Sequence, residues 1–517
     1  MKIEARYAGP ARASSTLESK IGVPVRGRCV VWSIAGSDSG AGAGLQADLK
    51  ALQAFGVHAC TAVAAITAQN SVAVTRVEPV SAALLDVQLA ALAQDLPPQA
   101  IKTGLLGSVE NLLVVCRWVD ALRAQGQELA LVVDPVLGSS TGTGFASEEL
   151  VQAYRRELLP RATLVTPNAG EAARLGLEPG QPTPNGQPSI VITGGDNSSA
   201  SGLASDWFSC PQASGWLSLP RLATPHQHGT GCSFAATAAA ALASGYCVAD
   251  AIVLAKMATT HALRHGYAAG LGAGPVCAQA DFAQHADNLP WMQAAPLQQT
   301  SFPGLTNPSL GLYAVVDNAD WVERVLAAGA RTVQLRIKDP QEPTLEAQIA
   351  RSVALAANTP GAQLFINDHW ALALRHGAYG VHLGQEDLAT ADLDALRAAG
   401  IRLGLSSHSY WEVARAWALR PSYIACGPIF ATRSKDMPWI PQGLDNLRYW
   451  AGLLPLPVVG IAGIDEASIA AVAATGAASA AVITAIARAA DPAAACARLQ
   501  AGFAAGRQTG DNAFCHN

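Results

Sequence analysis

The sequence predicts two α/β domains in tandem: a mainly parallel sheet with helices on both faces, then a compact (β/α)8 barrel. Short apolar runs alternate with helical patterns from residue 28 to 270 and again from 309 to 507, which is typical of repeated βα units. Residues 271–308, rich in proline, glycine and glutamine, interrupt this alternation and are expected to be a linker. We expect residues 1–27 to be an N-terminal extension and residues 508–517 a C-terminal tail.

The composition indicates two or three well-packed domains. The 517 residues exceed one ordinary domain, and half of them are hydrophobic. Only 14% are charged and the net charge is −5, which argues against a nucleic-acid or membrane-binding surface. Ten cysteines include no Cys-x-x-Cys pair, and no apolar span of 18 residues lacks polar breaks. We therefore expect a cytoplasmic chain with reduced thiols, no transmembrane helix and small-molecule partners, and a homo-oligomer stays open.

Residues 1–27 mix basic and acidic residues with small ones and contain no apolar core of a signal peptide. Two glutamates also argue against an organelle transit peptide. A frayed extension or a misassigned start is the favoured interpretation.

The first domain is predicted from five apolar runs that are continuous rather than alternating. Such runs indicate strands covered on both faces, as in a parallel sheet. They are residues 29–34, 62–66, 131–133, 163–165 and 190–192. A glycine-rich loop, residues 36–44, and a glycine-rich helix start near residue 229 then fall at strand carboxyl ends, where open α/β sheets bind ligands.

That helix start, Gly229-Thr230-Gly231-Cys232 before an alanine-rich run, predicts a phosphate site. Glycines let the backbone approach a phosphoryl group closely, and the first turn of a helix offers free N–H groups with a partial positive charge. Cys232 would lie where a proton acceptor meets an incoming hydroxyl. The competing interpretation is a capped core helix with a small buried cysteine.

Five motifs in order carry a family resemblance over about 200 residues. They are Ser33-Ile-Ala-Gly-Ser-Asp-Ser-Gly40 with its continuation to Lys50, Ile66-Thr-Ala-Gln69-Asn70, Lys102-Thr-Gly-Leu-Leu-Gly107, Val133-Asp134-Pro-Val136 and Thr166-Pro-Asn168-Ala-Gly-Glu171. With Gly-Thr-Gly-Cys they resemble the hydroxymethylpyrimidine and phosphomethylpyrimidine kinases of thiamine synthesis, which have a ribokinase-like three-layer α/β fold.

The resemblance implies two groups of ligand-binding residues. Those of the pyrimidine pocket are Gly36, Asp48, Gln69, Leu105 and Val136, and those toward magnesium-bound ATP are Asp134, Asn168, Glu171 and Thr230. The Gln69 amide suits an aminopyrimidine edge because it offers both a donor and an acceptor. The spacing of Asn168 and Glu171 is equally typical of a helix cap.

Two departures from the family pattern leave alternatives open for the first half. A flap lysine is replaced within Gly138-Ser-Ser-Thr-Gly-Thr-Gly144, and Thr193 stands where a lysine often precedes Gly-Gly. Fewer cations would then surround ATP. A pyridoxal kinase, or a non-catalytic domain that binds pyrimidine or regulates the barrel, are the competing interpretations.

The second domain is predicted from eight further apolar runs in about 200 residues. They are residues 312–316, 332–337, 363–366, 380–383, 402–406, 423–426, 458–461 and 480–483. Polar residues follow nearly every run, which favours a barrel with one pocket over a doubly wound sheet. Among them Asp368 and Asp387 suit Mg²⁺. Arg336, Lys338 and Lys435 suit phosphates, although surface salt bridges would explain each of them singly.

Residues 310–507 resemble thiamine phosphate synthase. In that family the diphosphate of the pyrimidine leaves as magnesium-bound pyrophosphate, and the thiazole nitrogen captures the resulting cation. The resemblance assigns Asn367, Asp368 and Asp387 to the metal and diphosphate, and Gln334, Arg336, Lys338, Ser406 and Lys435 to the substrate and leaving group. It assigns Thr432, Ser434, Gly463, Ile483 and Thr484 to the thiazole phosphate. Tyr379 stands where the family usually has aspartate, and the sequence assigns it no role.

Overall fold

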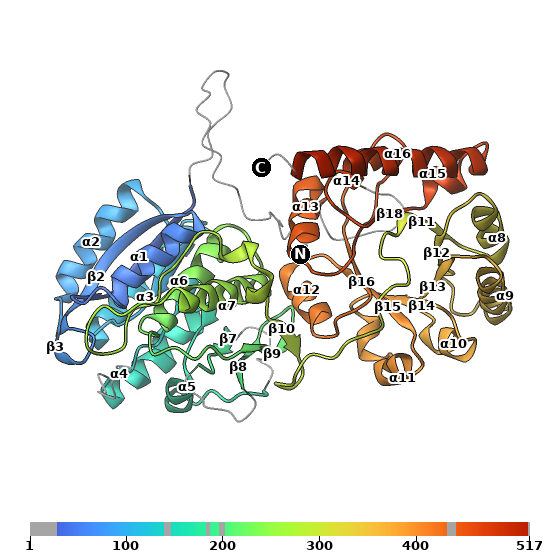
Figure 1. Cartoon of the computed structure of the whole chain (residues 1–517). Coiled ribbons are helices and arrows are strands. Elements are labelled where there is room, and N and C mark those ends of the chain that lie inside the picture. The colour runs from blue at the N-terminus through green and yellow to red at the C-terminus, as the bar shows by residue number, and fades with distance from the viewer. Residues whose placement is uncertain (1–27, 139–145, 182–186, 196–201, 432–440, 515–517) are drawn as a thin grey trace, which may run out of the picture. The chain divides into compact units, whose positions relative to one another are not determined.

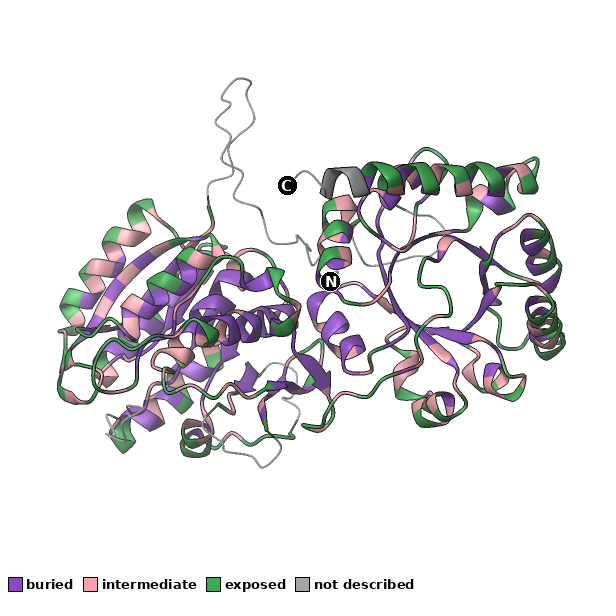
Figure 2. Ribbon diagram, in the orientation of Figure 1, coloured by how far each residue is buried: buried purple, intermediate pink, exposed green. Residues whose placement is uncertain are grey.

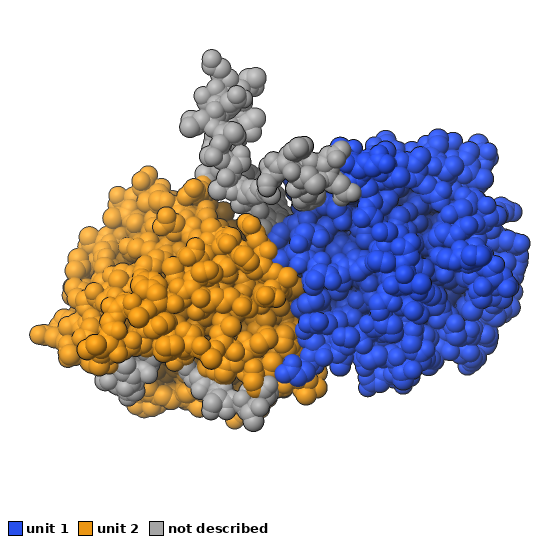
Figure 3. Space-filling view, in the orientation of Figure 1, with its two compact units in different colours: residues 1–9, 298–517 blue, residues 10–297 orange. Residues whose placement is uncertain are grey.

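The computed structural model describes residues 28–138, 146–181, 187–195, 202–431 and 441–514 (Figure 1). The described chain divides into two compact units, one ending at Leu297 and the other beginning at Gln298 (Figure 3).

The first unit is built on a sheet in which the described residues supply ten strands, in the order β10-β9-β8-β7-β6-β5-β4-β1-β2-β3. The central parallel strands are β2 (His58–Gln69), β1 (Val30–Asp38), β4 (Ala100–Thr103), β5 (Ala130–Val133), β6 (Leu164–Val165) and β7 (Ser189–Ile192). Antiparallel strands extend the sheet at both edges: β3 (Val74–Pro79) on one side, β8 (Leu203–Ser209), β9 (Ser214–Pro220) and β10 (Trp291–Gln293) on the other.

Helices cover both faces of this sheet, as the continuous apolar runs predict (Figure 1). On one face lie α1 (Gly44–Phe55), α6 (Thr230–Ala243) and α7 (Val248–Arg264), and on the other α2 (Ala82–Asp95) and α3 (Val109–Ala124). Helix α6 is buried along most of its length, because its small alanine side chains allow close approach of α1, α7 and the sheet (Figure 2). The predicted ribokinase-like three-layer fold is confirmed.

The second unit is a closed barrel of eight parallel strands among the described residues. They are β11 (Gly311–Val316), β12 (Thr332–Leu335), β13 (Gln363–Asn367), β14 (Gly380–Leu383), β15 (Arg402–Ser407), β16 (Tyr423–Cys426), β17 (Val458–Gly460) and β18 (Ser479–Val482). All eight predicted runs form these strands, so the predicted (β/α)8 barrel is confirmed. Aromatic side chains pack inside the barrel, where Tyr423 lies edge to face with both Tyr313 and Phe365.

Helices surround the barrel between successive strands (Figure 1). They are α8 (Ala319–Ala327), α9 (Leu345–Ala357), α10 (Trp370–Arg375), α11 (Leu393–Ala398), α12 (Tyr410–Trp417), α13 (Gly443–Leu453), α14 (Ile469–Ala473), α15 (Thr484–Ala487) and α16 (Pro492–Phe514). The expected tail from residue 508 is wrong, because α16 continues to Phe514. No helix among the described ranges is at once long and apolar enough to cross a bilayer.

The expected linker, residues 271–308, is also wrong in its extent. It is rich in proline and glycine, but several of its large apolar side chains, among them Phe282, Trp291 and Phe302, are buried in one or other unit. Trp291 pairs with Ser218 as part of β10, so the first unit extends past Pro290. In the second unit Phe302 N–H donates to the Arg420 carbonyl at 3.1 Å, and Gln299 Nε2 donates to the Trp417 carbonyl at 2.8 Å. The boundary therefore lies at residues 297–298.

Tyr379 has a structural role at the amino-terminal ends of the barrel strands. Its hydroxyl donates to Gln363 Oε1 at 2.5 Å and accepts a hydrogen bond from Thr306 N–H at 2.8 Å. Arg402 stacks on its ring, with the guanidinium carbon 4.4 Å from the centroid. Tyr379 thus fastens the segment that leads into β11, and it lies at the opposite end of β14 from the residues proposed for catalysis.

Candidate active sites

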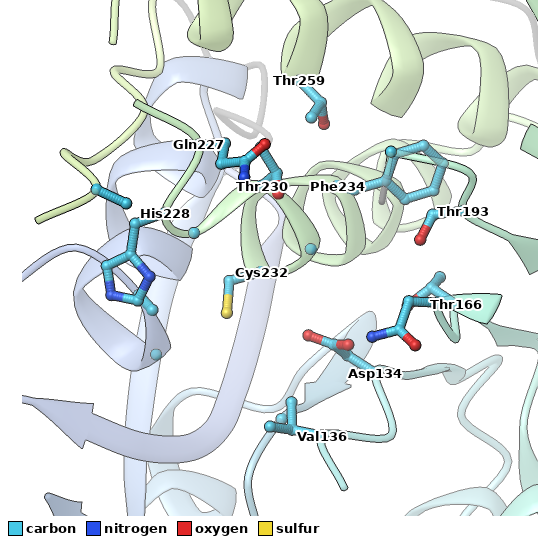
Figure 4. A pocket seen from close by; sticks show the side chains of 18 of the residues that line it. Asp134, Val136, Thr166, Thr193, Gln227, His228, Thr230, Cys232, Phe234 and Thr259 are labelled. Atoms are coloured by element: carbon cyan, nitrogen blue, oxygen red, sulfur yellow. The ribbon is translucent and has the colours of Figure 1, made fainter. Parts of the chain in front are cut away.

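The first unit contains a cavity of about 740 Å³ at the carboxyl ends of its parallel strands (Figure 4). Most residues that the sequence predicts for this site line it: Gly36, Gln69, Leu105, Asp134, Val136, Asn168, Glu171, Gly229, Thr230, Gly231 and Cys232. They come from β1, β2, the loops after β4, β5 and β6, and the start of α6.

The start of α6 lies against the glycine-rich loop before α1. Gly229 caps the helix with φ 88°, and a Cβ there would overlap the carbonyl oxygen of Gly42. Only glycine fits this left-handed conformation at such close approach. The first turn of α6, up to Cys232, lines the cavity, where a helix start favours an anion (Figure 4).

A buried cluster of charges lies beneath Cys232. Lys102 Nζ is 2.9 Å from Asp48 Oδ1 and 3.4 Å from Asp134 Oδ2, and Ser33 Oγ donates to Asp48 Oδ2 at 2.6 Å. Lys102 and Asp134 line the cavity, but Asp48 does not. The prediction that Asp48 lines the pyrimidine pocket is therefore wrong. Its carboxylate is instead fully buried and forms an ion pair with Lys102.

Burial governs the protonation of this cluster. It raises the pKa of Cys232 to about 12, although Lys102 acts in the opposite direction, so the thiol is protonated at neutral pH. Burial also raises the pKa of Asp134 above its ordinary value, against the attraction of Lys102. Asp134 is thus a carboxyl group at the cavity wall that binds a proton more readily than an exposed aspartate does.

Asn168 and Glu171 form a capping box at the start of α5 (Ala169–Leu175). Asn168 Oδ1 accepts from Glu171 N–H at 2.9 Å, and Glu171 Oε2 accepts from Asn168 N–H at 3.0 Å. The helix-cap interpretation of this motif is confirmed. Both side chains also line the cavity, so their oxygens remain candidates for ligand binding.

Three basic side chains that the sequence analysis did not identify line the same cavity: Arg174, Arg221 and Lys256. Lys256 Nζ lies 2.8 Å from Asp206, and Arg221 donates to the Gly195 carbonyl at 2.8 Å. Arg174 and Arg221 therefore bring guanidinium groups to a cavity for which the departures from the family pattern suggested fewer cations, whereas the charge of Lys256 is balanced by Asp206, which also lines the cavity. No motif could have identified them, because Lys256 lies in the middle of α7 and meets Asp206 of β8 only in the fold. The flap lies outside the described residues except for Gly138.

In the barrel, the two predicted metal ligands follow adjacent strands. Asn367, the last residue of β13, pairs with His382 of β14. Asp368 N–H donates to the His382 carbonyl at 3.0 Å, and Asp387 Oδ2 accepts from Gly384 N–H at 2.8 Å. The fold therefore brings these residues to one end of the barrel. Arg336 and Lys338 follow β12 at that end, whereas Thr432, Ser434 and Lys435 lie outside the described residues.

A chain of hydrogen bonds connects Ser406 to the barrel interior. Ser406 Oγ lies 2.9 Å from His382 Nε2, and His382 Nδ1 lies 2.7 Å from the Tyr423 hydroxyl. Tyr423 is 2.8 Å from the Tyr313 hydroxyl, which accepts from Gln334 Nε2 at 3.3 Å. No role was predicted for His382 or the two tyrosines, although they are polar residues inside apolar strands, which is a signal that the sequence carries.

The residues predicted for the thiazole phosphate follow the last two strands. Gly463, with φ 71°, lies in the loop after β17, where a Cβ would crowd Phe430. Ile483 and Thr484 begin α15 directly after β18. Their position agrees with the general location of phosphate sites in such barrels.

A further polar cluster, His261, Asp281 and His285, lies outside the cavity. His261 Nδ1 accepts from the Asn288 amide at 3.0 Å, so its Nε2 carries the proton and donates to Asp281 at 3.1 Å. A metal ion would need the lone pair of Nε2. The cluster instead fastens the 3-10 turns Phe282–Gln284 and Ala286–Asn288 to α7.

Comparisons with known proteins assign both units. The family model of phosphomethylpyrimidine kinase matches residues 38–277, and that of thiamine monophosphate synthase matches residues 312–486. A probable thiamine biosynthetic bifunctional enzyme, chloroplastic, from Oryza sativa subsp. japonica is 34% identical over 462 residues, which cover 85% of this chain and 81% of that protein.

Two further relatives each match one unit. The thiamine-phosphate synthase of Serratia proteamaculans is 54% identical over 201 residues, 39% of this chain and 94% of that protein. Among solved structures, the ADP complex of Bacillus subtilis pyridoxal kinase matches 49% of this chain and 98% of that chain, with 30% identity and a TM-score of 0.43. The chain belongs to the family of bifunctional thiamine biosynthetic enzymes, which join a phosphomethylpyrimidine kinase to a thiamine phosphate synthase.

Proposed function

We propose that the first unit transfers phosphoryl groups from ATP to hydroxymethylpyrimidine and then to its monophosphate, and that the second unit couples the diphosphate with thiazole phosphate. The observation that carries the kinase assignment is the glycine-rich start of α6 in the wall of the 740 Å³ cavity, directly above the pair of Lys102 and Asp134. A cavity of this size accommodates drug-sized ligands.

In the kinase site, catalysis rests on positioning and on charge stabilisation. The N–H groups at Gly231 and Cys232 bind the transferred phosphoryl group, and Lys102 adds positive charge beneath it. Cys232 orients the substrate hydroxyl as a neutral thiol, since its pKa is too high for a base at neutral pH. Gln69, Gly36, Leu105 and Val136 hold the pyrimidine.

Oxygen donors in the same cavity fit magnesium-bound ATP. Asp134, Asn168 and Glu171 offer the hard oxygen ligands that Mg²⁺ prefers, directly or through water. When bound, the ion neutralises phosphate charge. Thr230 and the cavity's Arg174, Arg221 and Lys256 are the remaining groups that we assign to the nucleotide.

In the barrel, Asn367, Asp368 and Asp387 form an oxygen donor set that suits Mg²⁺, which when bound screens the diphosphate charge. We assign Arg336, Lys338 and Lys435 to the leaving group, with Gln334 and Ser406 contacting the substrate. Ser406 is oriented by its hydrogen bond to His382. Thr432, Ser434, Gly463, Ile483 and Thr484 are assigned to the thiazole phosphate.

The test of the whole proposal is an end-point assay with the purified chain, hydroxymethylpyrimidine, ATP, Mg²⁺ and thiazole phosphate. We expect thiamine phosphate and inorganic pyrophosphate. Accumulation of the pyrimidine monophosphate without diphosphate would contradict the second phosphorylation. Absence of phosphorylation together with normal coupling of supplied diphosphate would support a non-catalytic first unit.

A double variant tests the metal assignment in the barrel. Asp368→Asn with Asp387→Asn is expected to abolish coupling and to spare the kinase, because the diphosphate loses its metal ligands. Isothermal titration with magnesium pyrophosphate measures the binding directly. Asp394→Asn, an exposed aspartate on α11, is the matched control. Wild-type binding in the double variant would place the metal elsewhere.

We place this chemistry in the cytoplasm. The nine cysteines of the described residues form no disulfide, which agrees with a reducing compartment. Fractionation of the source cells with an antibody to the chain tests this placement, and recovery in an organelle fraction would contradict it.

A further inference from the structure

The backbone of Gln69, at the end of β2, is fixed by hydrogen bonds, and the orientation of its side-chain amide is the feature that concerns a ligand. Ser39 Oγ donates to the Gln69 carbonyl at 2.6 Å and accepts from Gln69 N–H at 2.9 Å. The side-chain Nε2 lies 3.0 Å from His228 Nε2. The Thr67 hydroxyl, 3.5 Å from Oε1, donates to the Ser37 carbonyl at 3.0 Å instead. What remains to be decided is which end of the amide, the donor or the acceptor, meets a ligand.

His228 is held equally firmly. Its N–H donates to the Gly274 carbonyl at 3.1 Å, and its carbonyl accepts from Val276 N–H at 3.0 Å. Its ring lies directly against Gly42, where a Cβ would overlap the ring. Figure 4 shows the imidazole in the wall of the cavity, beside the start of α6.

The Nε2 atom of His228 has two neighbours, of which one requires it to accept a hydrogen bond and the other requires it to donate one. The Gln69 amide nitrogen is a donor, whereas Asp38 Oδ2, 3.3 Å away, is an acceptor. One ring nitrogen either accepts or donates. Asp38 already accepts from the N–H groups of Gly40, Gly42 and Ala43 at 2.8–2.9 Å, and the Gln69 amide is the nearer partner. Nε2 therefore accepts from Gln69, and the ring proton lies on Nδ1.

We propose that His228 is a positioning residue, which turns the Gln69 amide so that Oε1 faces the ligand and thereby makes the kinase select substrates with a hydrogen-bond donor beside the hydroxymethyl group. This inference rests on the proposed function, in which Gln69 meets the pyrimidine. Hydroxymethylpyrimidine carries an amino group at that position and pyridoxal carries a formyl oxygen. The formyl oxygen would face Gln69 Oε1, acceptor against acceptor.

Three substitutions at His228 separate this role from a general structural one. His228→Gln retains an acceptor for Gln69 together with a donor for Asp38, so the preference for hydroxymethylpyrimidine over pyridoxal is expected to persist. His228→Leu removes both. His228→Lys offers donors alone and turns Gln69 Oε1 away from the ligand. The measured quantity is the ratio of kcat/KM for the two substrates, and His58→Gln, an exposed histidine at the other end of β2, is the control.

We expect the ratio to fall about 10- to 100-fold in the leucine variant and further in the lysine variant, as for one misplaced polar pair in a specificity pocket. A merely structural role would lower kcat/KM for both substrates in parallel. An unchanged ratio in the folded leucine or lysine variant overturns the proposal.

A measurement on the wild-type chain needs no variant to fold. Long-range ¹H–¹⁵N spectra of the histidine-labelled protein report the tautomer, and we expect His228 to be protonated at Nδ1. Protonation at Nε2 overturns the inference alone. If the proposed function itself were wrong, the wild-type protein would phosphorylate no hydroxymethylpyrimidine, whichever nitrogen of His228 carries the proton.

Discussion

Lys102 shows how one residue can connect the fold of the kinase unit to its chemistry. It is fully buried between a carboxylate of α1 and one that follows β5, and it is also part of the cavity wall. Charges are buried at such a cost that each needs a partner. Asp48 forms the fully buried ion pair with Lys102, whereas Asp134 lies at the cavity surface.

Lys102→Met is therefore expected to destabilise the first unit by about 3–5 kcal/mol, because two carboxylates lose their buried partner. Urea unfolding of the full chain checks this, with the transition of the barrel as internal reference. Arg117→Met breaks the exposed ion pair with Asp86 and should cost at most about 1 kcal/mol. Equal losses of unfolding free energy in the two variants would show that the buried cluster stabilises the unit no more than an exposed ion pair does.

Cys232→Ala should lower kinase turnover about 100-fold, the typical effect of one positioned group at a transition state. Coupling of supplied diphosphate should be unchanged. The wild-type kinase rate should also show no inflection near the ordinary pKa of a thiol, since burial raises the pKa of Cys232 to about 12. A rate that rises with an apparent pKa near 8.5 would indicate a thiolate instead.

Sequence spacing predicted residues of the cavity wall wherever their contacts are local. Gly229 and Cys232 belong to one helix start, and Asn168 and Glu171 to another. In each motif the residues are close in the sequence, so their spacing predicts them. Lys102, Lys256 and His382 have partners that are distant in the sequence: Asp48, Asp206 and Tyr423. Spacing carries no information on such pairs, which also explains the misplacement of Asp48.

Among the elements, buried strands that read as continuous apolar runs could be predicted, but the central strand β4 could not, because Lys102 and Thr103 interrupt its apolar run. All eight barrel strands could be predicted, because each is buried and reads as a continuous apolar run. The antiparallel edges of the kinase sheet could not. Strand β3 is mostly exposed, and β10 has three residues inside a stretch rich in proline, so neither shows a pattern above its surroundings.

The turns that follow Asp281 predict a loss of stability in acid. Burial lowers the pKa of His261 below its ordinary value of 6.5, and the hydrogen bond from His285 lowers that of Asp281. In both cases the unfolded chain binds protons more readily, so both stabilisations are complete above pH 6.5. That of His261 is lost as the pH falls below 6.5, and that of Asp281 only as the pH falls below the ordinary aspartate pKa of 3.8.

Calorimetry should therefore show a lower melting temperature for the first unit at pH 5 than at pH 7. His261→Gln removes the titrating ring and should reduce this difference. The exposed His58→Gln should leave it unchanged. A pH dependence that is identical in wild type and His261→Gln would place the sensitive groups elsewhere.

The whole chain should separate into two functional proteins at residues 297–298. Residues 1–297 are expected to be a soluble kinase and residues 298–517 a soluble synthase, since each unit has its own core and its own site. Their mixture should restore thiamine phosphate formation, with a lag if the covalent link raises the local diphosphate concentration. An inactive or insoluble piece would show that the units depend on each other.

A shorter first piece, residues 1–290, tests the corrected boundary. It lacks β10, so Trp216, Leu217 and Ser218 of β9 lose their antiparallel partners and become an open sheet edge. This piece should melt at a lower temperature and aggregate more readily than residues 1–297. Equal behaviour of both pieces would return residues 291–297 to the linker.

The contacts of Tyr379 bear on how such a chain can arise in evolution. They fasten the incoming segment to the amino-terminal ends of the barrel strands, whereas the loops that carry the proposed site residues follow the carboxyl ends. The Serratia synthase, matched over 94% of its length by the second unit alone, shows that this barrel also exists without a kinase. A gene fusion at the amino terminus of an independent synthase would therefore add sequence at the end of the barrel opposite the proposed active site, which need not change for the fusion to be retained.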